Sequence, residues 1–467
     1  MKMWSGRFRQ ALDPDFERWQ SSLDFDQRLL KHELAASGAH ARALKDAGIV
    51  SSSELIAILQ GLEKIGDLAA ASPDFLADGE AEDVHHFVEK HLVALIGDSG
   101  YKLHSGRSRN EQIATDLRLY VRAAIDQQRE ELAEFAEVLL QRAEQAGNAA
   151  MPGYTHLQRA EPVLVSHWLL AYVEMFLRDA DRLADCRKRV NVCPLGSGAV
   201  AGATLPLDRR AMAASLGFDA TTANSIDATS DRDFILEFVN ALSLLALHLS
   251  RWAEEMILFS TQEFGFIHLP EAYSTGSSAM PQKKNPDLLE LTRGKAGRVI
   301  GNATALMIAV KGLPLAYNKD LQEMQEPLFG SAETMLALVP LVTGWVKAAE
   351  FDYERMQQAA QSGFMNAWAA ATYLVQRGVP SRLAHEQVGR VVQMCVDRGC
   401  ELQDLALDEL RSVDPLFDQD VYTRLTLDSV LAIHDVPGGT APARVHQAMA
   451  EAKRKIEAIS EEVHAHP

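Results

Sequence analysis

The chain has 467 residues, of which 47% are hydrophobic, and it carries a formal net charge of -18 at pH 7. This length and composition predict one large domain or a few smaller ones around a sizeable core, and they exclude a disordered chain. The acidic balance, without any long run of basic residues, argues against binding to nucleic acid or to an anionic membrane surface.

The cysteines and the apolar segments narrow the class of protein further. The four cysteines form neither a CxxC pair nor a set with histidines at zinc-ligand spacing, so we interpret them as reduced thiols. The N-terminus lacks the apolar core of a signal peptide, and the most apolar segment, residues 238–249, is too short to span a bilayer. We therefore expect a cytoplasmic protein that does not enter a membrane.

Helical patterns fill the first hundred residues, where no strand-like alternation stands out. Residues 28–47 and 53–68 carry helix start and stop signals. A third pattern, residues 78–96, contains the adjacent histidines His85 and His86. Adjacent side chains point in different directions on a helix, so they do not predict a metal pair of the HxxxH kind. We expect His86 to be a satisfied or solvated histidine.

A long helical pattern over residues 107–147 begins with a basic cluster. Arg107 and Arg109 offer forked donors that suit carboxylates, and the start of a helix adds the positive end of a dipole. The alternative, a solvated basic turn that pairs with surface acids, stays open on these residues alone.

The connection at residues 151–158 reads MPGYTHLQ, and a helical pattern over residues 163–190 follows it. The ordinary pKa of histidine suits proton transfer near neutrality, which makes His156 a candidate acid or base. A single polar residue in a loop is nevertheless rarely catalytic, so the sequence of this loop does not decide whether His156 acts in catalysis.

Residues 195–204 read LGSGAVAGAT, which has neither dinucleotide-binding spacing nor the end of a P-loop, so we expect a tight turn and no cofactor. Residues 230–266 are apolar almost all round, which predicts a helix buried on all sides. The pattern at 286–311 carries Gly294, Gly297 and Gly301 at helical spacing. Each glycine costs roughly 0.8 to 1 kcal/mol relative to Ala inside a helix, so we predict close helix contact there.

These patterns, with a further one at residues 331–360, predict an all-α fold built on a long central bundle of about five helices. We expect a helical N-terminal domain over 1–106, the bundle over 107–360 and a helical C-terminal domain over 361–467. The apolar surface exceeds what one bundle can bury, which favours a homo-oligomer.

The stretch that concentrates the most reactive groups is residues 276–287, which read GSSAMPQKKNPD. A glycine-hinged loop that carries Ser277, Ser278, Lys283 and Lys284 is typical of a lid over an anion. The alternative is a surface connection in which Asn285 is simply the N-cap of the next helix.

Several strings together carry a resemblance to a known family. Besides the loop at 276–287, they are MWSGRF (3–8), SGRSRNEQ (105–112), PGYTHLQ (152–158), YNKDLQE (317–323) and GGTAP (438–442). This set resembles the fumarase/aspartase superfamily. The QKKN string within the loop at 276–287 resembles the argininosuccinate lyase family most closely. The alternatives are the adenylosuccinate lyase family, which usually has HKRN at this point, and a lens crystallin-like structural homologue without turnover.

The resemblance implies a β-elimination that needs no metal or organic cofactor and splits L-argininosuccinate into L-arginine and fumarate. It implies a homotetramer with a core of helices and active sites built from three subunits. Ser277 would be the base and Lys283 the cation that holds the charge of the intermediate. His156 would be the acid or would organise a water that acts as one, and Glu290 would orient it.

The resemblance also implies a set of substrate-binding positions. These are Ser22, Asp26, Asp83, His85, Ser108, Arg109, Asn110, Thr155, Arg232, Asn285, Tyr317, Lys319 and Gln322. Arg232 and Lys319 would add to the local cations that an acidic protein needs for an acidic substrate. One departure is visible, because Met324 and Gln325 stand where the family usually has an acidic and a basic residue.

Overall fold

The computed structural model describes residues 10–77 and 80–465, so the MWSGRF string lies outside the described residues. The chain divides into two compact units. Unit 1 comprises Met1–Gln127, Arg182–Leu244 and Gly297–Met335, and unit 2 comprises Gln128–Asp181, Leu245–Ala296 and Leu336–Pro467. The division into domains at residues 106 and 360 stays a prediction.

Five long helices have parts in both units, and they are the five that the hydrophobic patterns predict. They are α6 (Arg109–Ala146), α7 (Val165–Val190), α10 (Asp233–Ser260), α11 (Asp287–Val310) and α12 (Gln325–Ala348). Within unit 1, the Cys186 thiol on α7 donates to the Phe234 carbonyl on α10, and Asn302 on α11 donates to Ser331 on α12. The predicted all-α class is confirmed.

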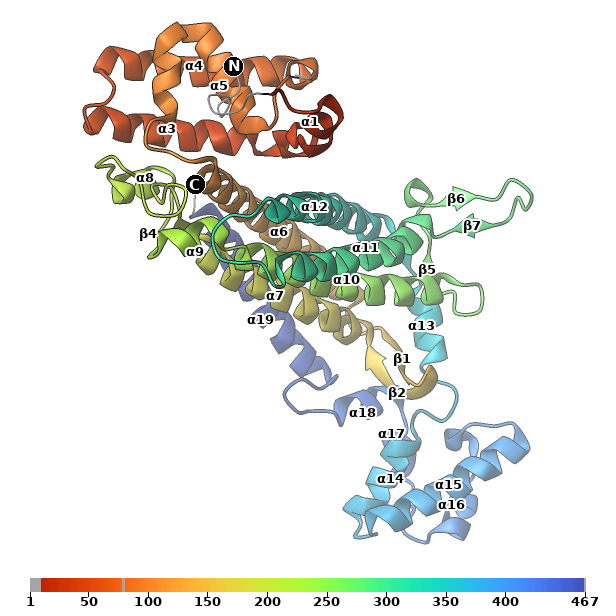
Figure 1. Cartoon of the computed structure of the whole chain (residues 1–467). Coiled ribbons are helices and arrows are strands. Elements are labelled where there is room, and N and C mark those ends of the chain that lie inside the picture. The colour runs from red at the N-terminus through yellow and green to blue at the C-terminus, as the bar shows by residue number, and fades with distance from the viewer. Residues whose placement is uncertain (1–9, 78–79, 466–467) are drawn as a thin grey trace. The chain divides into compact units, whose positions relative to one another are not determined.

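The other elements of unit 1 are short helices and one pair of two-residue strands. They are α1 (Pro14–Gln20), α2 (Leu23–Asp26), η2 (Gln27–Leu29), α3 (Leu30–Asp46), α4 (Ser52–Ala71), η3 (Pro73–Leu76), α5 (Val84–Ile96), η4 (Gly97–His104), β3 (Val192–Cys193), α8 (Arg209–Ser215), β4 (Ala220–Thr221), α9 (Ser225–Ser230) and η6 (Lys319–Met324). Helices α3, α4 and α5 pack together, as Figure 1 shows. A capping box between Ser51 and Glu54 starts α4, which is why the serine cluster there marked a helix start.

Unit 2 contains the remaining elements. They are β1 (Ala150–Thr155), β2 (Gln158–Leu164), β5 (Ile267–His268), η5 (Glu271–Tyr273), β6 (Thr275–Gly276), β7 (Lys284–Asn285), β8 (Glu350–Phe351), α13 (Tyr353–Ala359), α14 (Ala367–Gln376), α15 (Ser381–Arg398), η7 (Leu402–Asp404), α16 (Leu407–Val413), α17 (Val421–Arg424), α18 (Leu427–Ala432) and α19 (Pro442–His464). Its core includes Phe135, Trp252 and Trp345, whose side chains are fully buried and meet edge to face.

Three expectations need correction. Helix α10 is not buried on all sides, because Leu244 and Leu247 are 40% and 41% exposed in the single chain. The predicted close contact at the α11 glycines is absent within the described chain, since a Cβ built on Gly297 would meet no atom within 4 Å. The connection at residues 151–158 is not an irregular loop, because β1 and β2 pair antiparallel there as a hairpin.

Two segments, Asp233–Ser260 and Lys319–Ala348, are long and apolar enough to cross a membrane by length and composition alone. Half of the most apolar window of the first, and 56% of that of the second, is buried inside the protein. The core helices of a globular protein have the same character, so we interpret both segments as core helices.

Candidate active site

A cavity of about 150 Å³ in unit 1 gathers most of the predicted substrate-binding residues. It is lined by Ser22, Asp26, Glu82, Asp83, His85, Arg109, Asn110, Ile113, Tyr317, Lys319, Gln322 and Gln325. These residues come from four stretches of sequence, at α2, at the turn into α5, at the start of α6, and from Tyr317 through η6 to the start of α12. Tertiary folding therefore brings together nine of the thirteen substrate-binding positions that the resemblance implied.

Asp26 is the most unusual carboxyl group in this cavity. It accepts a hydrogen bond from the Ser22 hydroxyl at 2.6 Å and one from the Val84 backbone N–H at 3.1 Å. Burial and the neighbouring charge of Asp83 nevertheless raise the pKa of Asp26 to about 7. A protonated Asp26 can donate a hydrogen bond in a wall that also holds the carboxylates of Glu82 and Asp83.

Asp83 links helix α5 to the cations of the cavity. Its carboxylate caps α5 through the His86 backbone N–H at 2.7 Å and accepts from Arg109 Nη1 at 2.9 Å. Burial opposes its charge, but the contact with His85 and the charge of Arg109 together hold the pKa of Asp83 well below its usual range. Glu82 lies beside it, 3.4 Å from Arg109 and 3.9 Å from Lys319.

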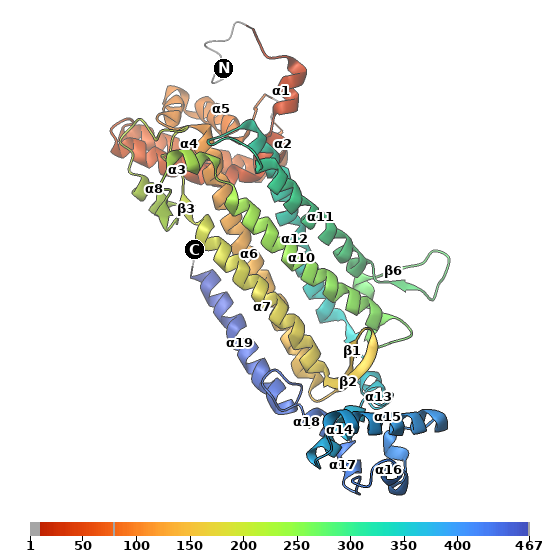
Figure 2. The ribbon, with the colours of Figure 1, turned by 60° about the horizontal axis from the view of Figure 1, so that its bottom comes forward.

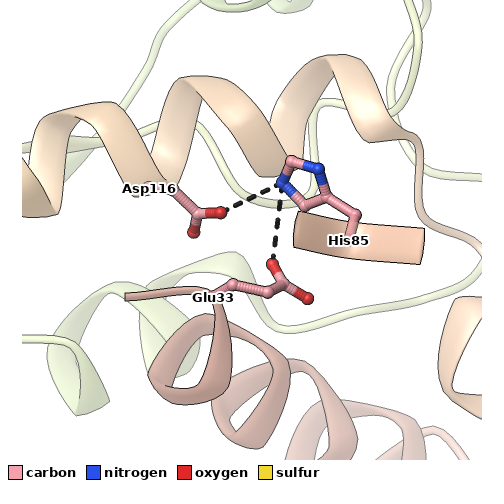
Figure 3. A group of neighbouring side chains, drawn as sticks. All are labelled: Glu33, His85 and Asp116. Atoms are coloured by element: carbon pink, nitrogen blue, oxygen red, sulfur yellow. Dashed lines mark hydrogen bonds and ion pairs between the residues drawn. The ribbon is translucent and has the colours of Figure 1, made fainter. Parts of the chain in front are cut away.

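His85 lies in the cavity wall, and its Nε2 faces the buried carboxylates of Asp116 and Glu33 (Figure 3). Its Nε2 lies 3.1 Å from Asp116 Oδ2 and 3.9 Å from Glu33 Oε2, and its Nδ1 lies 3.7 Å from Asp83 Oδ1. Burial lowers the pKa of His85, but the hydrogen bond with Asp116 and the nearby carboxylates of Asp83 and Glu33 outweigh it and raise the pKa well above its ordinary value. These carboxylates therefore favour the doubly protonated imidazole.

Glu33, His85 and Asp116 also form a group that could in principle hold a metal ion, since their ligand atoms lie within 4.8 Å of one another. The separation between His85 Nε2 and Asp116 Oδ2 is that of a charge-assisted hydrogen bond, which satisfies both atoms without an ion. The nearby Arg107 guanidinium, 3.7 Å from Glu33, already supplies positive charge. These residues fit an ion-pair cluster better than a metal centre.

Arg232 is fully buried just before α10, and it has no carboxylate partner among the described residues. Its Nη1 donates to the Asp231 carbonyl at 2.7 Å, whereas Nε and Nη2 have no hydrogen-bond partner among the described residues. Burial lowers the pKa of Arg232 to about 10, and its charge acts on Tyr317 in the cavity wall. Buried guanidinium donors without a partner are costly, so their free pair is suited to a bound carboxylate.

Ser108 and Asn110 lie at the start of α6. The Ser108 hydroxyl accepts from the Asn110 backbone N–H at 3.2 Å, and the Ser108 N–H donates to Glu111 Oε1 at 3.1 Å. This reciprocal arrangement is a capping box, so Ser108 has a structural task whether or not it contacts a substrate. The Asn110 side chain lines the cavity and donates to the Ala199 carbonyl at 3.4 Å.

The helix η6 supplies the last wall. Gln322 lines the cavity and donates to the Gln20 carbonyl at 3.2 Å, while Lys319 keeps its ammonium half exposed. At the departure from the family pattern, Met324 is buried and Gln325 lines the cavity. Gln325 thus presents a neutral amide where the family usually has a charge.

The remaining predicted residues belong to unit 2, and Thr155 and His156 lie at the tip of the β1–β2 hairpin. Thr155 pairs with Gln158, so the turn consists of His156 and Leu157 alone. Both have positive φ, 55° and 58°, which is the backbone of a type I′ turn, usually made by Asn and Gly. A histidine and a leucine in this conformation are strained, and such strain is concentrated at functional sites.

The predicted lid, residues 276–287, is a second hairpin, which projects from the start of α11 (Figures 1 and 2). The Ser277 hydroxyl oxygen accepts from the backbone N–H groups of Ala279 and Met280 at 3.3 and 3.1 Å. Lys283 donates a short hydrogen bond to Asn285. Helix α11 begins at Asp287, so Asn285 is not its N-cap and its side-chain amide instead donates to Thr275 at 3.3 Å.

Glu290 is exposed one turn into α11. Neither a hydrogen bond nor an ion pair joins Glu290 to His156 within the described chain, so unit 2 of one molecule does not assemble the predicted acid and its orienting group. The sequence reasoning also missed Glu33, Glu82 and Asp116. Asp116 could have been noticed, because it interrupts the apolar face of α6 between Ile113 and Leu117.

Comparison with known proteins places this geometry in a family. Residues 6–301 match the family described as lyase, and residues 364–432 match the argininosuccinate lyase C-terminal family. Argininosuccinate lyase of Koribacter versatilis is 58% identical over 464 residues, covering 99% of each chain. Argininosuccinate lyase of Heliobacterium mobile is 50% identical and covers 97% of this chain and 99% of its own.

Solved structures agree with the sequence relatives. A variant of EDDS lyase with bound fumarate has a TM-score of 0.83 and 25% identity, covering 98% of this chain and 93% of its own. The 3-carboxy-cis,cis-muconate lactonizing enzyme from Pseudomonas putida has a TM-score of 0.71 at 22% identity, which shows a shared fold. With relatives of this identity over nearly the whole chain, the protein belongs to the argininosuccinate lyase family.

Proposed function

We propose that this protein splits L-argininosuccinate into L-arginine and fumarate, and that it does so without a metal or an organic cofactor. The observation that carries the proposal is the cavity of unit 1, which holds Arg109 and Lys319 and adjoins the buried, incompletely paired Arg232. Three cations in an acidic protein suit a substrate with several carboxylates. The relatives that cover nearly all of the chain carry the name of this activity.

The reaction is a β-elimination. A base removes a proton from the carbon next to one carboxylate, and the electron pair moves onto that carboxylate as a dianion. The electron pair then returns to form the double bond of fumarate, while the C–N bond breaks and arginine leaves with a proton on its guanidino nitrogen. Because the proton removed is only weakly acidic, stabilising the dianion is the main catalytic task.

We assign the proton abstraction to Ser277. The two backbone N–H groups that point at its oxygen would stabilise a negative charge there, and Lys283 lies in the same short hairpin. A serine hydroxyl is a poor base at its ordinary pKa, so these donors and the exclusion of water on substrate binding must favour the alkoxide. Lys283 and Asn285, which already contact each other, would turn toward the developing dianion.

We assign the protonation of the leaving nitrogen to His156, either directly or through a water. Its position at the exposed tip of a hairpin lets the imidazole reach a substrate, and Thr155 beside it can bind a substrate oxygen. The strained turn fixes the direction of the side chain, which is what a proton donor requires. Glu290 would orient His156 from another copy of the chain.

The oligomer we propose is a homotetramer in which several subunits build each active site. Support comes from apolar side chains that the single chain leaves exposed, such as Leu244 and Leu247 on α10 and Leu291 and Ile308 on α11. The open space beside Gly297 on α11 would let a partner helix approach closely. Cytoplasmic location belongs to the same proposal.

The proposal is tested by mixing the purified protein with argininosuccinate and, separately, with adenylosuccinate, and by following the ultraviolet absorbance of fumarate. We expect the absorbance to rise with the first substrate alone, with one arginine formed for each fumarate. A rise with adenylosuccinate alone would assign the protein to the other branch of the superfamily. No rise with either would favour a structural protein of the same fold.

A further inference from the structure

The buried cluster behind the cavity contains two carboxylates that the elimination itself does not use. Glu33 lies on α3 and Asp116 on α6, and both are 1% exposed or less. Neither lines the wall from which Arg109 and Lys319 reach the substrate. The burial of two carboxylates that take no part in the elimination needs an explanation, because burying a carboxylate costs free energy unless it is paired.

The contacts of Glu33 show that only one of its oxygens is satisfied by neutral and cationic donors. Its Oε1 accepts from Ser37 at 2.5 Å and from Gln112 at 3.1 Å and lies 3.7 Å from Arg107. Its Oε2 has no hydrogen bond within the part of the chain that the structure describes, and it faces His85 Nε2 at 3.9 Å. Asp116 adds the direct hydrogen bond to the same nitrogen.

The other ring nitrogen of His85 continues the chain of contacts toward the cavity. Nδ1 lies 3.7 Å from Asp83 Oδ1, and the second oxygen of Asp83 accepts from Arg109 Nη1 at 2.9 Å. A neutral imidazole has one N–H, so it would present a lone pair to one of these carboxylates. An imidazolium carries an N–H on each nitrogen, so it can donate to Asp116 through Nε2 while its charge attracts the Asp83 carboxylate, 3.7 Å from Nδ1.

We propose that Asp116 and Glu33 are positioning residues that keep His85 doubly protonated, so that His85 holds Asp83 and Asp83 holds the Arg109 guanidinium in the substrate cavity. This inference rests on the proposed function, in which Arg109 binds a carboxylate of the substrate. Residues outside the cavity would then set the orientation of a cation inside it.

The charged groups around His85 come from every element that packs near it. They are Asp26 at the end of α2, Glu33 on α3, Asp83 and Glu89 at the start and middle of α5, His104 on η4, Arg107 before α6, and Arg109 and Asp116 on α6. Only the carboxylates among them favour the imidazolium. Removing one acid therefore shifts the balance toward neutral His85, because burial opposes its charge.

The test uses Asp116→Asn, which keeps the size of the side chain and removes its charge. Neutral His85 would no longer attract the Asp83 carboxylate, and Arg109 could then pair with Asp83 in a different geometry. Substrate binding should therefore weaken as the pH rises. We expect KM within about threefold of the wild type at pH 6 and raised roughly tenfold or more at pH 8.5, with kcat changed by less than about threefold. Asp116→Glu should restore the wild-type pH profile.

The matched control is Asp126→Asn, on the same helix. Its carboxylate pairs with Arg187 at 2.5 and 2.9 Å and does not line the cavity, so this variant should follow the wild type at both pH values. A KM ratio for Asp116→Asn that stays flat between pH 6 and 8.5 would overturn the proposal. So would a stoichiometric metal in the wild-type protein, or tight binding of added Zn²⁺, that Asp116→Asn abolishes, because the cluster would then be a metal site.

A readout independent of turnover separates this inference from the proposed function. The melting temperature of Asp116→Asn should lie furthest below that of the wild type at pH 6 and should approach it as the pH rises to 8.5, because His85 keeps a proton in the wild type that it loses in the variant. This pH dependence should become smaller when both proteins also carry His85→Asn. If the wild type forms no fumarate, the proposed function fails. The comparison of Asp116→Asn with and without His85→Asn still shows whether Asp116 acts through His85. A pH-dependent difference of the same size without His85 would contradict it.

Discussion

His156 and Leu157 together form the two-residue turn of the β1–β2 hairpin, and both occupy the left-handed backbone region that Asn and Gly normally supply. For residues of this size the conformation costs roughly 1 to 2 kcal/mol each. The hairpin register leaves no other connection, because Thr155 and Gln158 already pair. This strain supports the assignment of a function to the turn.

His156→Asn is the variant that tests the acid role with least disturbance of the turn, since Asn adopts this backbone readily. We expect the melting temperature to stay the same or rise, and kcat to fall by about 10² to 10⁴. KM should change much less than kcat, because a proton donor acts on the transition state. Steady-state kinetics with argininosuccinate measure both constants, and a kcat within threefold of the wild type would remove His156 from the mechanism.

Ser277→Ala should abolish turnover and leave substrate binding within a fewfold of the wild type, because the base is lost and the cavity cations remain. The matched control is Ser278→Ala, which removes the neighbouring exposed hydroxyl and should keep most of the activity. Fumarate absorbance measures turnover, and calorimetric titration with argininosuccinate measures binding. Equal losses in the two variants would show that the loop needs both hydroxyls and that Ser277 is not special.

Arg232→Met should raise the stability of the protein and weaken its binding of substrate. Removing a buried guanidinium with two unpaired donors should stabilise the ligand-free protein by about 1 to 3 kcal/mol, seen as a higher melting temperature. The same change should raise KM by more than about tenfold, because the donor pair for a substrate carboxylate is gone. A lower melting temperature with an unchanged KM would assign Arg232 to the core and not to the site.

Asp26 makes stability depend on pH. Its pKa is raised from 3.8 to about 7 on folding, so between these values the folded protein binds more protons than the unfolded one, and stability falls as the pH rises from 4 to 7. Asp26→Asn should therefore raise the melting temperature relative to the wild type at pH 8 and much less at pH 4. The gain corresponds to at most about 4 kcal/mol. An equal gain at both pH values would mean that Asp26 is ionised in the folded protein.

The sequence predicted the long helices well because their apolar periodicity is local and strong, as in α6 and α11, whose starts lie within two residues of the expected ones. The β1–β2 hairpin escaped prediction because its strands carry Pro152 and Pro162 and its turn lacks the usual Asn-Gly signal. Local sequence patterns predict helices and strands. They do not predict a turn whose residues disfavour the backbone conformation that the rest of the hairpin imposes on them.

The site residues show the same limit of local sequence patterns. Family strings identified the wall residues Arg109 and Lys319, whereas the Glu33 and Asp116 pair joins helices far apart in the sequence, and only the fold brings it to His85. The exposed Leu244 likewise contradicts the fully buried helix that its apolar neighbours predict, because periodicity does not say which neighbour, the same chain or a partner, covers a face.

We propose that the cavity of unit 1 and the hairpins of unit 2, supplied by different subunits, act on one substrate, and the most direct test co-expresses two inactive variants. Arg109→Ala damages only the cavity and Ser277→Ala only the signature loop. Because a shared site can draw both intact parts from different chains, mixed oligomers purified through two different affinity tags should regain a measurable fraction of the wild-type fumarate production. Mixed oligomers as inactive as either parent would contradict the shared active site.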